Sequence, residues 1–223
     1  MTRPVVVKCG GAVAESAADL ILELADAEPV VVVHGAGPQI SAEMERRGLE
    51  VQFVGGRRVT SREALDVVRE SMVEVNATLC AAIGEPAVPL FGDEIGLHAL
   101  QVPMLGMVGD PIPCAPEVVV AALEEELIPV VAPLAAGPLN VNADEMAAAL
   151  AVGLDAERIL FVTDVPGLLD GGVVVPVIDA DEAGKLLDAG AFQGGIIPKL
   201  RAAITAAQLG VRAEIGATEV VAA

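Results

Sequence analysis

The sequence predicts an α/β fold, a three-layer αβα sandwich around a mainly parallel central sheet. Two observations favour it. Short runs of β-branched and other apolar residues alternate with longer amphipathic runs, and several of the longer runs open with Ser, Pro, Asp or Asn. The alternation is typical of βαβ units, and those opening residues are typical helix starts. With 223 residues, 54% of them hydrophobic, the chain can bury one full-sized core.

The elements follow in order along the chain. The short β-branched runs predict strands at residues 5–9, 30–34, 87–91, 128–132, 158–163 and 211–215. The longer amphipathic runs predict helices at residues 15–27, 38–47, 61–83, 116–126, 143–152, 180–189 and 196–209. Between residues 95 and 113 short apolar pieces are punctuated by Gly and Pro. That pattern predicts hairpins that project from the sheet.

Composition excludes several classes of protein. The net charge of −19 argues against a nucleic-acid partner, because such proteins usually carry a basic face. No apolar stretch approaches the roughly 20 residues of a membrane span, and the first residues lack a signal-peptide pattern, so we expect no membrane partner and a cytoplasmic location. Cys9, Cys80 and Cys114 are odd in number and far apart, which favours core thiols over disulfides or a metal knuckle.

Glycine-rich loops follow the first two predicted strands. Gly10-Gly11 and Gly35-Ala36-Gly37 would let backbone N–H groups approach an anion beside a helix N-terminus. Each could equally be a tight turn between a strand and a helix. The second loop lacks the third glycine of a dinucleotide fingerprint, and the chain lacks GxxxxGK[ST]. A Rossmann dehydrogenase or a P-loop enzyme is therefore disfavoured.

Polar residues also stand where packing alone does not require them. Asn140, Asn142 and Asp144 precede an Ala-rich helical run, and helix capping explains one of them. Two amides and a carboxylate could fix a polar substrate and orient nearby lysines. Lys8 and Lys199 lie in apolar, Gly-rich segments, and Lys199 opposes the dipole of its helix. The ordinary alternative is that both are lysines at element ends with stems along apolar surface.

Several short motifs occur in one order along the chain. They are Lys-Cys-Gly-Gly at 8–11, Val-His-Gly-Ala-Gly at 33–37, Gly-Arg-Arg-Val-Thr at 56–60, Asn-Val-Asn-Ala-Asp at 140–144, Thr-Asp-Val-Pro-Gly-Leu at 163–168 and Gly-Ile-Ile-Pro-Lys at 195–199. Their order and spacing resemble the amino acid kinase family from residue 3 to about residue 215. Within it, the chain is most similar to the enzymes that phosphorylate N-acetyl-L-glutamate in arginine biosynthesis. The resemblance implies the amino acid kinase fold, ATP as cofactor, and Mg²⁺ carried by ATP with no metal site of the protein's own.

The resemblance also implies roles for single residues. Lys8 and Lys199 would flank the transferring phosphoryl group, with Asp144 holding both lysines in position. Arg58 and Asn140 would take the α-carboxylate of the acceptor. Other implied substrate contacts are Ala36, Gly37 and Asn142. Implied nucleotide contacts are Gly10, Gly11, Thr163, Asp164, Val165, Pro166, Gly167, Leu168, Ala191, Phe192 and Gln193.

The chemistry agrees with these roles. A carboxylate acceptor is already ionised at pH 7, so its phosphorylation needs no general base. Alignment and positive charge are what the transition state requires. The planar fork of Arg58 suits a carboxylate, and His34 is expected to be a structural residue at a strand end.

Residues 1–223 are expected to form a single domain, with an acceptor-binding and dimerisation lobe over about 1–152 and a nucleotide-binding lobe over about 153–223. We expect a homodimer, in which the helix at 61–83 contributes a large apolar surface. In the family, arginine feedback depends on a helix before the first strand. Here that strand begins by about Pro4, so we expect activity to be indifferent to arginine.

Two other functions stay open. One is the related aminoadipate kinase of lysine biosynthesis, whose acceptor is one methylene longer and is carried by a small protein. A pocket discriminates such a difference by only about 1–3 kcal/mol. The other is a catalytically inactive amino-acid-sensing domain. The presence of Lys8, Lys199 and Asp144 together favours an enzyme.

Overall fold

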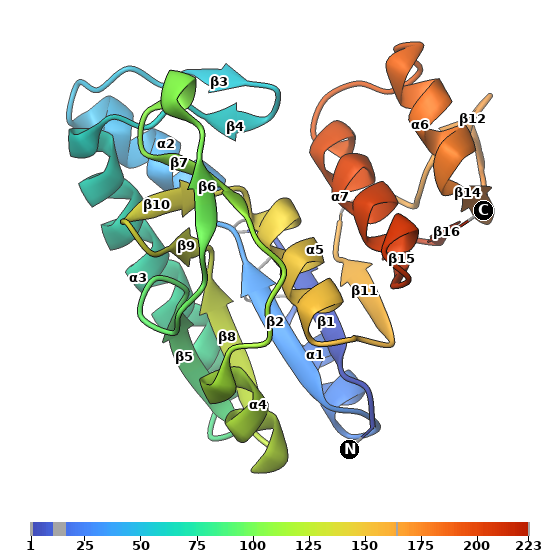
Figure 1. Ribbon diagram of the computed structural model, residues 1–223, viewed down its shortest axis with the longest axis horizontal. Coiled ribbons are helices and arrows are strands. Elements are labelled where there is room, and N and C mark those ends of the chain that lie inside the picture. The colour runs from blue at the N-terminus through green and yellow to red at the C-terminus, as the bar shows by residue number, and fades with distance from the viewer. Residues whose placement is uncertain (1, 11–16, 164, 223) are drawn as a thin grey trace.

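The computed structural model describes residues 2–10, 17–163 and 165–222. One eight-stranded sheet forms the centre of the molecule (Figure 1). Its order is β14 (Val177–Asp179), β16 (Thr218–Val221), β15 (Arg212–Ile215), β11 (Arg158–Phe161), β1 (Val5–Cys9), β2 (Val30–His34), β8 (Ile128–Ala132) and β5 (Ala87–Phe91). Strands β15 and β16 pair antiparallel, and the other neighbours in this order pair parallel. The predicted fold class is therefore confirmed.

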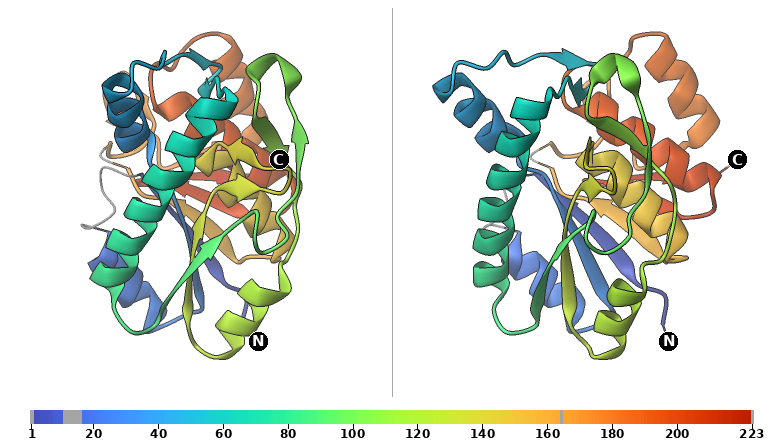
Figure 2. Two further views of the ribbon diagram at one scale, coloured as in Figure 1. Left: turned by 90° about the vertical axis from the view of Figure 1, so that its left-hand side faces the viewer. Right: turned by 60° about the vertical axis from the view of Figure 1, so that its left-hand side comes forward.

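Helices cover both faces of this sheet (Figure 2). One face packs against α1 (Ala18–Ala25), α2 (Gly37–Arg46) and α3 (Arg62–Ile83), and the other against α4 (Glu117–Glu124), α5 (Ala143–Gly153), α6 (Ala180–Asp188) and α7 (Ile196–Gln208). Successive side chains of a strand point to opposite faces. In β1, Val5 and Val7 accordingly join one hydrophobic core and Val6 joins the other. The predicted helices are confirmed, although residues 15 and 16 lie outside the described part.

The strand bounds were predicted best for four short apolar runs between residues 5 and 132. The runs at 5–9, 30–34, 87–91 and 128–132 have the predicted bounds, β11 ends at Phe161 instead of residue 163, and β15 begins at Arg212. Strands β14 and β16 were not predicted. They are short and lie at one side of the sheet, where pairing with neighbours decides the structure more than local sequence does.

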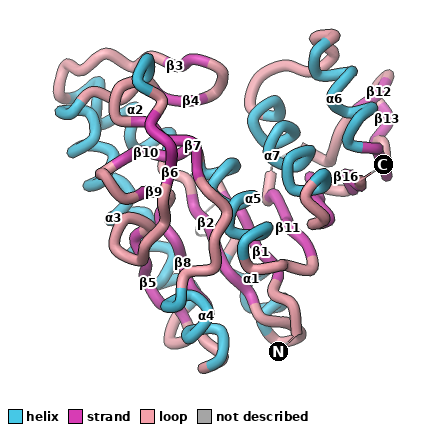
Figure 3. Tube along the Cα trace, viewed as in Figure 1, coloured by secondary structure: helices cyan, strands magenta, loops and turns pink. Residues whose placement is uncertain are grey.

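A smaller sheet of four strands lies beside the carboxyl ends of the large one (Figure 3). It contains β6 (Ala99–Gln101), β7 (Val108–Pro111), β10 (Leu139–Val141) and β9 (Leu134–Ala135). Strands β6 and β7 form the antiparallel hairpin predicted between residues 95 and 113. Two further hairpins were not predicted, β3 (Phe53–Val54) with β4 (Arg57–Arg58) and β12 (Leu169–Asp170) with β13 (Val173–Val174).

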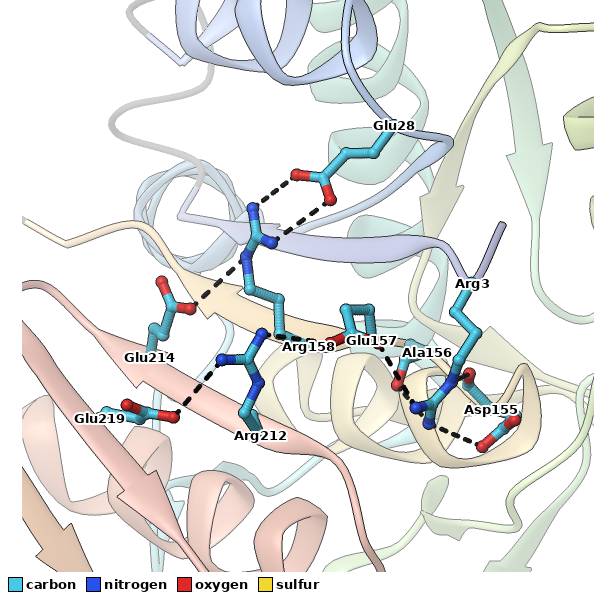
Figure 4. Close-up of polar contacts among 9 residues, drawn as sticks. All are labelled: Arg3, Glu28, Asp155, Ala156, Glu157, Arg158, Arg212, Glu214 and Glu219. Atoms are coloured by element: carbon cyan, nitrogen blue, oxygen red, sulfur yellow. Dashed lines mark hydrogen bonds and ion pairs between the residues drawn. The ribbon is translucent and has the colours of Figure 1, made fainter. Parts of the chain in front are cut away.

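An ion-pair network lies at the amino ends of the strands, the edge of the sheet away from these hairpins (Figure 4). Arg158, at the start of β11, bonds Glu28 at 2.5 Å and lies 3.4 Å from Glu214 of β15. Arg212, its partner residue on β15, lies 3.2 Å from Glu157 and 3.8 Å from Glu219. Through Glu28, the network joins the segment before β2 to strands β11, β15 and β16.

Three expectations about the surface and the thiols can be compared with the structure. Cys9 is buried, and burial raises the pKa of its thiol to about 11. Cys80 and Cys114 are only half-buried, so the expectation of core thiols was wrong for those two.

Within α3, Val73 is the one large hydrophobic side chain exposed, so the helix lacks the expected large apolar surface. The homodimer stays a prediction. No helix in the described part of the chain is both long and apolar enough to cross a membrane.

Candidate active site

The carboxyl ends of β1 and β2, the first turns of α2 and α5, and the β3–β4 hairpin surround a cavity of about 240 Å³. Two glycine-rich loops supply part of its wall. Eight of the site residues predicted from the sequence line this cavity: Lys8, Gly10, Ala36, Gly37, Arg58, Asn140, Asn142 and Asp144. The structure thus brings together residues that lie up to about 136 positions apart in the sequence.

A buried carboxylate lies between two lysines at one wall. Lys8 projects from β1, and its Nζ lies 2.8 Å from Oδ1 of Asp144. Both side chains are less than a tenth exposed, at 6% and 7%. Lys199, in the first turn of α7, places its Nζ 3.9 Å from the same oxygen, and its side chain is 17% exposed. Two ammonium groups and one carboxylate leave a net positive charge, which favours an anion such as phosphate.

Asn142 decides where α5 begins. Its side-chain oxygen accepts hydrogen bonds from the backbone N–H groups of Asp144 at 2.9 Å and Glu145 at 3.2 Å, which is an N-cap. Its amide nitrogen donates to the carbonyl of Gly56 in the β3–β4 turn at 3.2 Å. Asn142 therefore has a structural role as a helix cap, and it orients Asp144 by fixing the first turn of α5.

Arg58 is the most unusual group in the cavity. The residue is 6% exposed, and its Nη2 donates to the Gly37 carbonyl at 3.0 Å and to Ser41 Oγ at 2.9 Å. The guanidinium also lies 4.6 Å from the centre of the Phe53 ring. Burial lowers the pKa of Arg58. Within the described part of the chain, no carboxylate lies within ion-pair distance of it. A buried guanidinium without a neutralising carboxylate favours an anionic ligand.

Asn140 reaches Arg58 through a residue that the sequence did not single out. Asn140 is buried, and its amide nitrogen donates to Thr60 Oγ1 at 3.0 Å. The Thr60 hydroxyl in turn donates to the Arg58 carbonyl at 2.8 Å. This chain of bonds joins β10 to β4 and holds both predicted acceptor contacts in one wall.

The first turn of α2 supplies the opposite wall. Ala36 is the N-cap residue, 2% exposed, and Gly37 begins the helix. An added Cβ at Gly37 would meet nothing within 4 Å. The partial positive charge of a helix N-terminus therefore lies at the cavity, where it favours an anion.

His34, at the end of β2, is structural as expected. It is fully buried, and the amide nitrogen of Asn76 lies 3.1 Å from its Nε2 and donates to the Val130 carbonyl at 2.9 Å. Because an amide nitrogen is a donor, Nε2 is the acceptor and the ring is neutral. Burial lowers the pKa of His34 to about 4.

Of the implied nucleotide residues, Gly10 lines this cavity, and most of the others lie on two loops outside its lining. They are Thr163, Val165, Pro166, Gly167 and Leu168 after β11, and Ala191, Phe192 and Gln193 before α7. The Leu168 side chain is 1% exposed, in the core, while its N–H donates to Thr218 Oγ1 at 2.8 Å. Its carbonyl accepts from the Val175 N–H at 2.9 Å, so the structure leaves no exposed group of Leu168 to contact a ligand. Gly11 and Asp164 lie outside the described residues, and the nucleotide contacts stay a prediction.

A second, larger groove of about 900 Å³ lies between the β3–β4 and β6–β7 hairpins and helices α5, α6 and α7. Its lining is largely apolar, and it includes none of Lys8, Arg58 and Asp144. The smaller cavity is therefore the candidate active site. In the part of the chain that the structure describes, no three His, Cys, Asp or Glu side chains are grouped to hold a metal ion.

Sequence reasoning missed the residues that support Arg58 and its hairpin. These are Ser41, Phe53 and Glu145, together with Arg57 and Thr60, which belong to the motif at 56–60 but were given no role. Ser41 stands four residues after Gly37, one helical turn along α2, which is a weak signal that could have been used. Phe53 had none, because its hairpin strand is two residues long.

Comparison with known proteins gives a consistent result. A model of the amino acid kinase family matches residues 3–216. Acetylglutamate kinase of Roseiflexus castenholzii is 39% identical, with 96% of this chain and 91% of that protein covered. The acetylglutamate kinase of Rubrobacter xylanophilus is 40% identical, with 96% and 88% covered.

Solved structures show the same fold. A Streptococcus mutans protein, 28% identical, has a TM-score of 0.87, with 99% of both chains covered. Carbamate kinase from Giardia lamblia bound to AMP-PNP has a TM-score of 0.75 at 16% identity, with 100% of this chain and 99% of that chain covered.

Proposed function

This chain belongs to the amino acid kinase family, and we propose that it is an acetylglutamate kinase. It would transfer the γ-phosphoryl group of ATP to the γ-carboxylate of N-acetyl-L-glutamate. The observation that carries the proposal is the buried, unneutralised guanidinium of Arg58 in the same cavity as the Lys8–Asp144–Lys199 cluster. Relatives named acetylglutamate kinase at 39% and 40% identity support the choice of acceptor.

In this proposal, Arg58 binds the α-carboxylate of the acceptor. Its Nη2 already donates to Gly37 and Ser41, which fixes the plane of the guanidinium before the acceptor arrives. Asn140, held by Thr60, adds an amide oxygen and donor at the same wall. Preorganised groups lose little further freedom when the ligand binds, which strengthens binding.

Transfer then requires the γ-carboxylate to attack the γ-phosphorus of ATP. A carboxylate oxygen–phosphorus bond forms, the bond between the γ-phosphorus and its bridging oxygen breaks, and the products are acetylglutamyl phosphate and ADP. The acceptor is already ionised, so no side chain needs to remove a proton. Lys8 and Lys199 stabilise the charge on the transferring group from the two sides, and Asp144 holds both ammonium groups in place.

Mg²⁺ would arrive with ATP and would neutralise part of the charge of the nucleotide phosphates. The residues described fit a metal carried by the nucleotide, because Asp144 is already paired with Lys8. We further propose that residues up to about 152 bind the acceptor and the remainder binds the nucleotide.

The test is an ADP-release assay with ATP and Mg²⁺, with the acyl phosphate trapped as a hydroxamate. N-acetyl-L-glutamate should be the preferred acceptor among acetylaspartate, aminoadipate derivatives, glutamate and UMP. Free glutamate should be poor, because its ammonium group would be buried without a matching carboxylate. Faster turnover of an aminoadipate derivative would refute the acceptor assignment, and no turnover of any acceptor would favour the inactive sensing domain.

A further inference from the structure

Arg57, next to Arg58 in β4, makes its own set of contacts on the other side of the hairpin. Its Nε lies 3.0 Å and 3.1 Å from the two carboxylate oxygens of Glu145 on α5. Its Nη2 also pairs with Asp110 of β7. The Arg57 and Glu145 side chains are each 25% exposed. Burial raises the pKa of Glu145, and the bonds from Arg57 oppose that rise.

Arg57 and Arg58 point to opposite sides of β4, and Asp144 and Glu145 face two different sides of α5. Neighbouring side chains of a strand point to opposite faces. Arg58 therefore reaches Gly37 and Ser41 in the candidate active site. Arg57 borders both that cavity and the larger groove, and its guanidinium bonds Glu145, which borders the larger groove. On α5, Asp144 and Glu145 are also neighbours, and each faces one side of this arrangement. One ion pair thus joins the strand that carries Arg58 to the helix that carries Asp144.

The hairpin is short and partly exposed, and its other side-chain supports come from α2, β7 and β10. Its two strands have two residues each, and Phe53 and Val54 are 52% and 49% exposed. Gly55 and Gly56 form the turn with φ of 59° and 85°, values that favour glycine. An isolated hairpin of this size is marginally stable. From α5, the contacts that hold it are the Arg57–Glu145 pair and the bond from Asn142 to Gly56.

We propose that Arg57 and Glu145 form a positioning pair that sets the guanidinium of Arg58 relative to Asp144 and so determines the affinity for the acceptor. This inference rests on the proposed function for its kinetic part. In this proposal both act through Arg58, because the guanidinium of Arg57 is bonded to Glu145 and Asp110. Loss of the pair lets the hairpin move away from α5, which displaces Arg58 while leaving the lysines in place.

The test compares Arg57→Leu and Glu145→Gln with Arg212→Leu, a matched arginine that also contacts two carboxylates but lies far from the hairpin. We expect Arg57→Leu to raise the KM for N-acetylglutamate about tenfold or more, with kcat within about twofold and an unchanged KM for ATP. Hydrogen exchange of the amides at residues 52–60 should become faster. Glu145→Gln should have the same effects to a smaller degree, because one oxygen can still accept from Arg57. Arg212→Leu should change none of them.

An additional double variant, Arg57→Leu with Glu145→Leu, tests whether the contact between the hairpin and α5 matters or the charge of the pair does. Apolar partners can restore a contact that a buried ion pair supplied, so we expect its KM to be lower than that of Arg57→Leu. An unchanged KM and unchanged exchange in Arg57→Leu would overturn the inference, as would equal effects of Arg212→Leu. If Arg57→Leu does not fold, Glu145→Gln decides by the same criteria. If the wild type does not use N-acetylglutamate, the proposed function fails, and hydrogen exchange alone then decides whether the pair holds the hairpin.

Discussion

Buried polar groups are divided unequally between the two halves of the chain. Among the described residues up to 152, eight polar or charged side chains are buried: Lys8, His34, Arg58, Thr60, Ser71, Asn76, Asn140 and Asp144. Among the described residues from 153 onward, Thr218 is the one such residue. A buried polar group must be held by partners, because leaving it unpaired costs free energy. The first half therefore contains a fixed, desolvated polar site, which suits recognition of a small carboxylate.

The second half presents its candidate groups near solvent. Lys199 is more exposed than Lys8, and Val165, Ala191 and Gln193 are exposed. With the proposed roles, we expect stability and acceptor recognition to be coupled in the first half and separable from nucleotide use in the second. Substitutions in the two halves should differ accordingly.

The largest difference is expected between the two lysines. Lys8→Met leaves the buried carboxylate of Asp144 with Lys199 at 3.9 Å as its remaining lysine, which should destabilise the fold by about 3–5 kcal/mol. Lys199→Met should lower stability by about 1 kcal/mol or less. Both should lower kcat about 10²-fold or more, because they stabilise transition-state charge. Urea unfolding and hydroxamate kinetics measure the two quantities. Equal stability losses would break the comparison, and an unchanged kcat would contradict the roles of the lysines.

The pH dependence due to histidine should belong to the first half, because residues 153–223 contain no histidine. The folded protein holds His34 neutral, with its pKa lowered from 6.5 to about 4. Below pH 6.5 the unfolded chain binds a proton that the folded chain does not. The stability due to His34 is therefore complete above that pH and is lost as the pH falls toward 4, by about 3 kcal/mol. Urea unfolding of wild type and His34→Gln between pH 7 and pH 4.5 measures it. The variant should lose less stability over that range, and parallel curves would show that His34 does not contribute.

A substitution of Arg58 should weaken binding of the acceptor without changing binding of the nucleotide. Arg58→Lys keeps the charge but loses the planar fork that holds Gly37 and Ser41. We expect the KM for N-acetylglutamate to rise about 10- to 100-fold, the range given by the loss of one or two charge-assisted hydrogen bonds. The KM for ATP should stay constant. Initial rates with either substrate varied measure both constants, and a change in the KM for ATP alone would reverse the assignment of Arg58.

The smallest effect should come from the ion-pair network that joins the halves. Arg158→Ala removes contacts to Glu28 and Glu214, and Arg212→Ala removes contacts to Glu157 and Glu219. Partly exposed pairs contribute about 0.2–1 kcal/mol each, so both losses should be small, and the more exposed Arg212 should matter less. Both losses of stability should be smaller in high salt, which screens the charges. Urea unfolding with and without 0.5 M NaCl, at which the Debye length is roughly 4 Å, tests this. A loss of stability that does not depend on salt would indicate that the arginines act through packing instead of charge.

The sequence by itself determined the elements with strong local signals. The runs at 5–9, 30–34, 87–91 and 128–132 became strands with the predicted bounds. Three of them, at 5–9, 30–34 and 128–132, are rich in β-branched residues and buried throughout, which suits strands covered on both faces. The run at 87–91 is an edge strand. Ser61 and Asn142 cap α3 and α5 within a helical turn of themselves, and such signals act over a few residues. The motifs around Lys8, Asp144 and Lys199 also identified candidates that the fold brought together.

The tertiary structure decided what those candidates contact. Asn140 and Thr60 are 80 residues apart, Asn142 and Gly56 are 86, and Arg57 and Glu145 are 88. No local pattern specifies such pairs. The short hairpin of β3 and β4 exists because α5 and the smaller sheet hold it, and Leu168 is buried because Thr218 anchors its loop. Sequence periodicity predicts which face of an element is apolar, whereas the partner of a polar group depends on the folding of distant segments against each other.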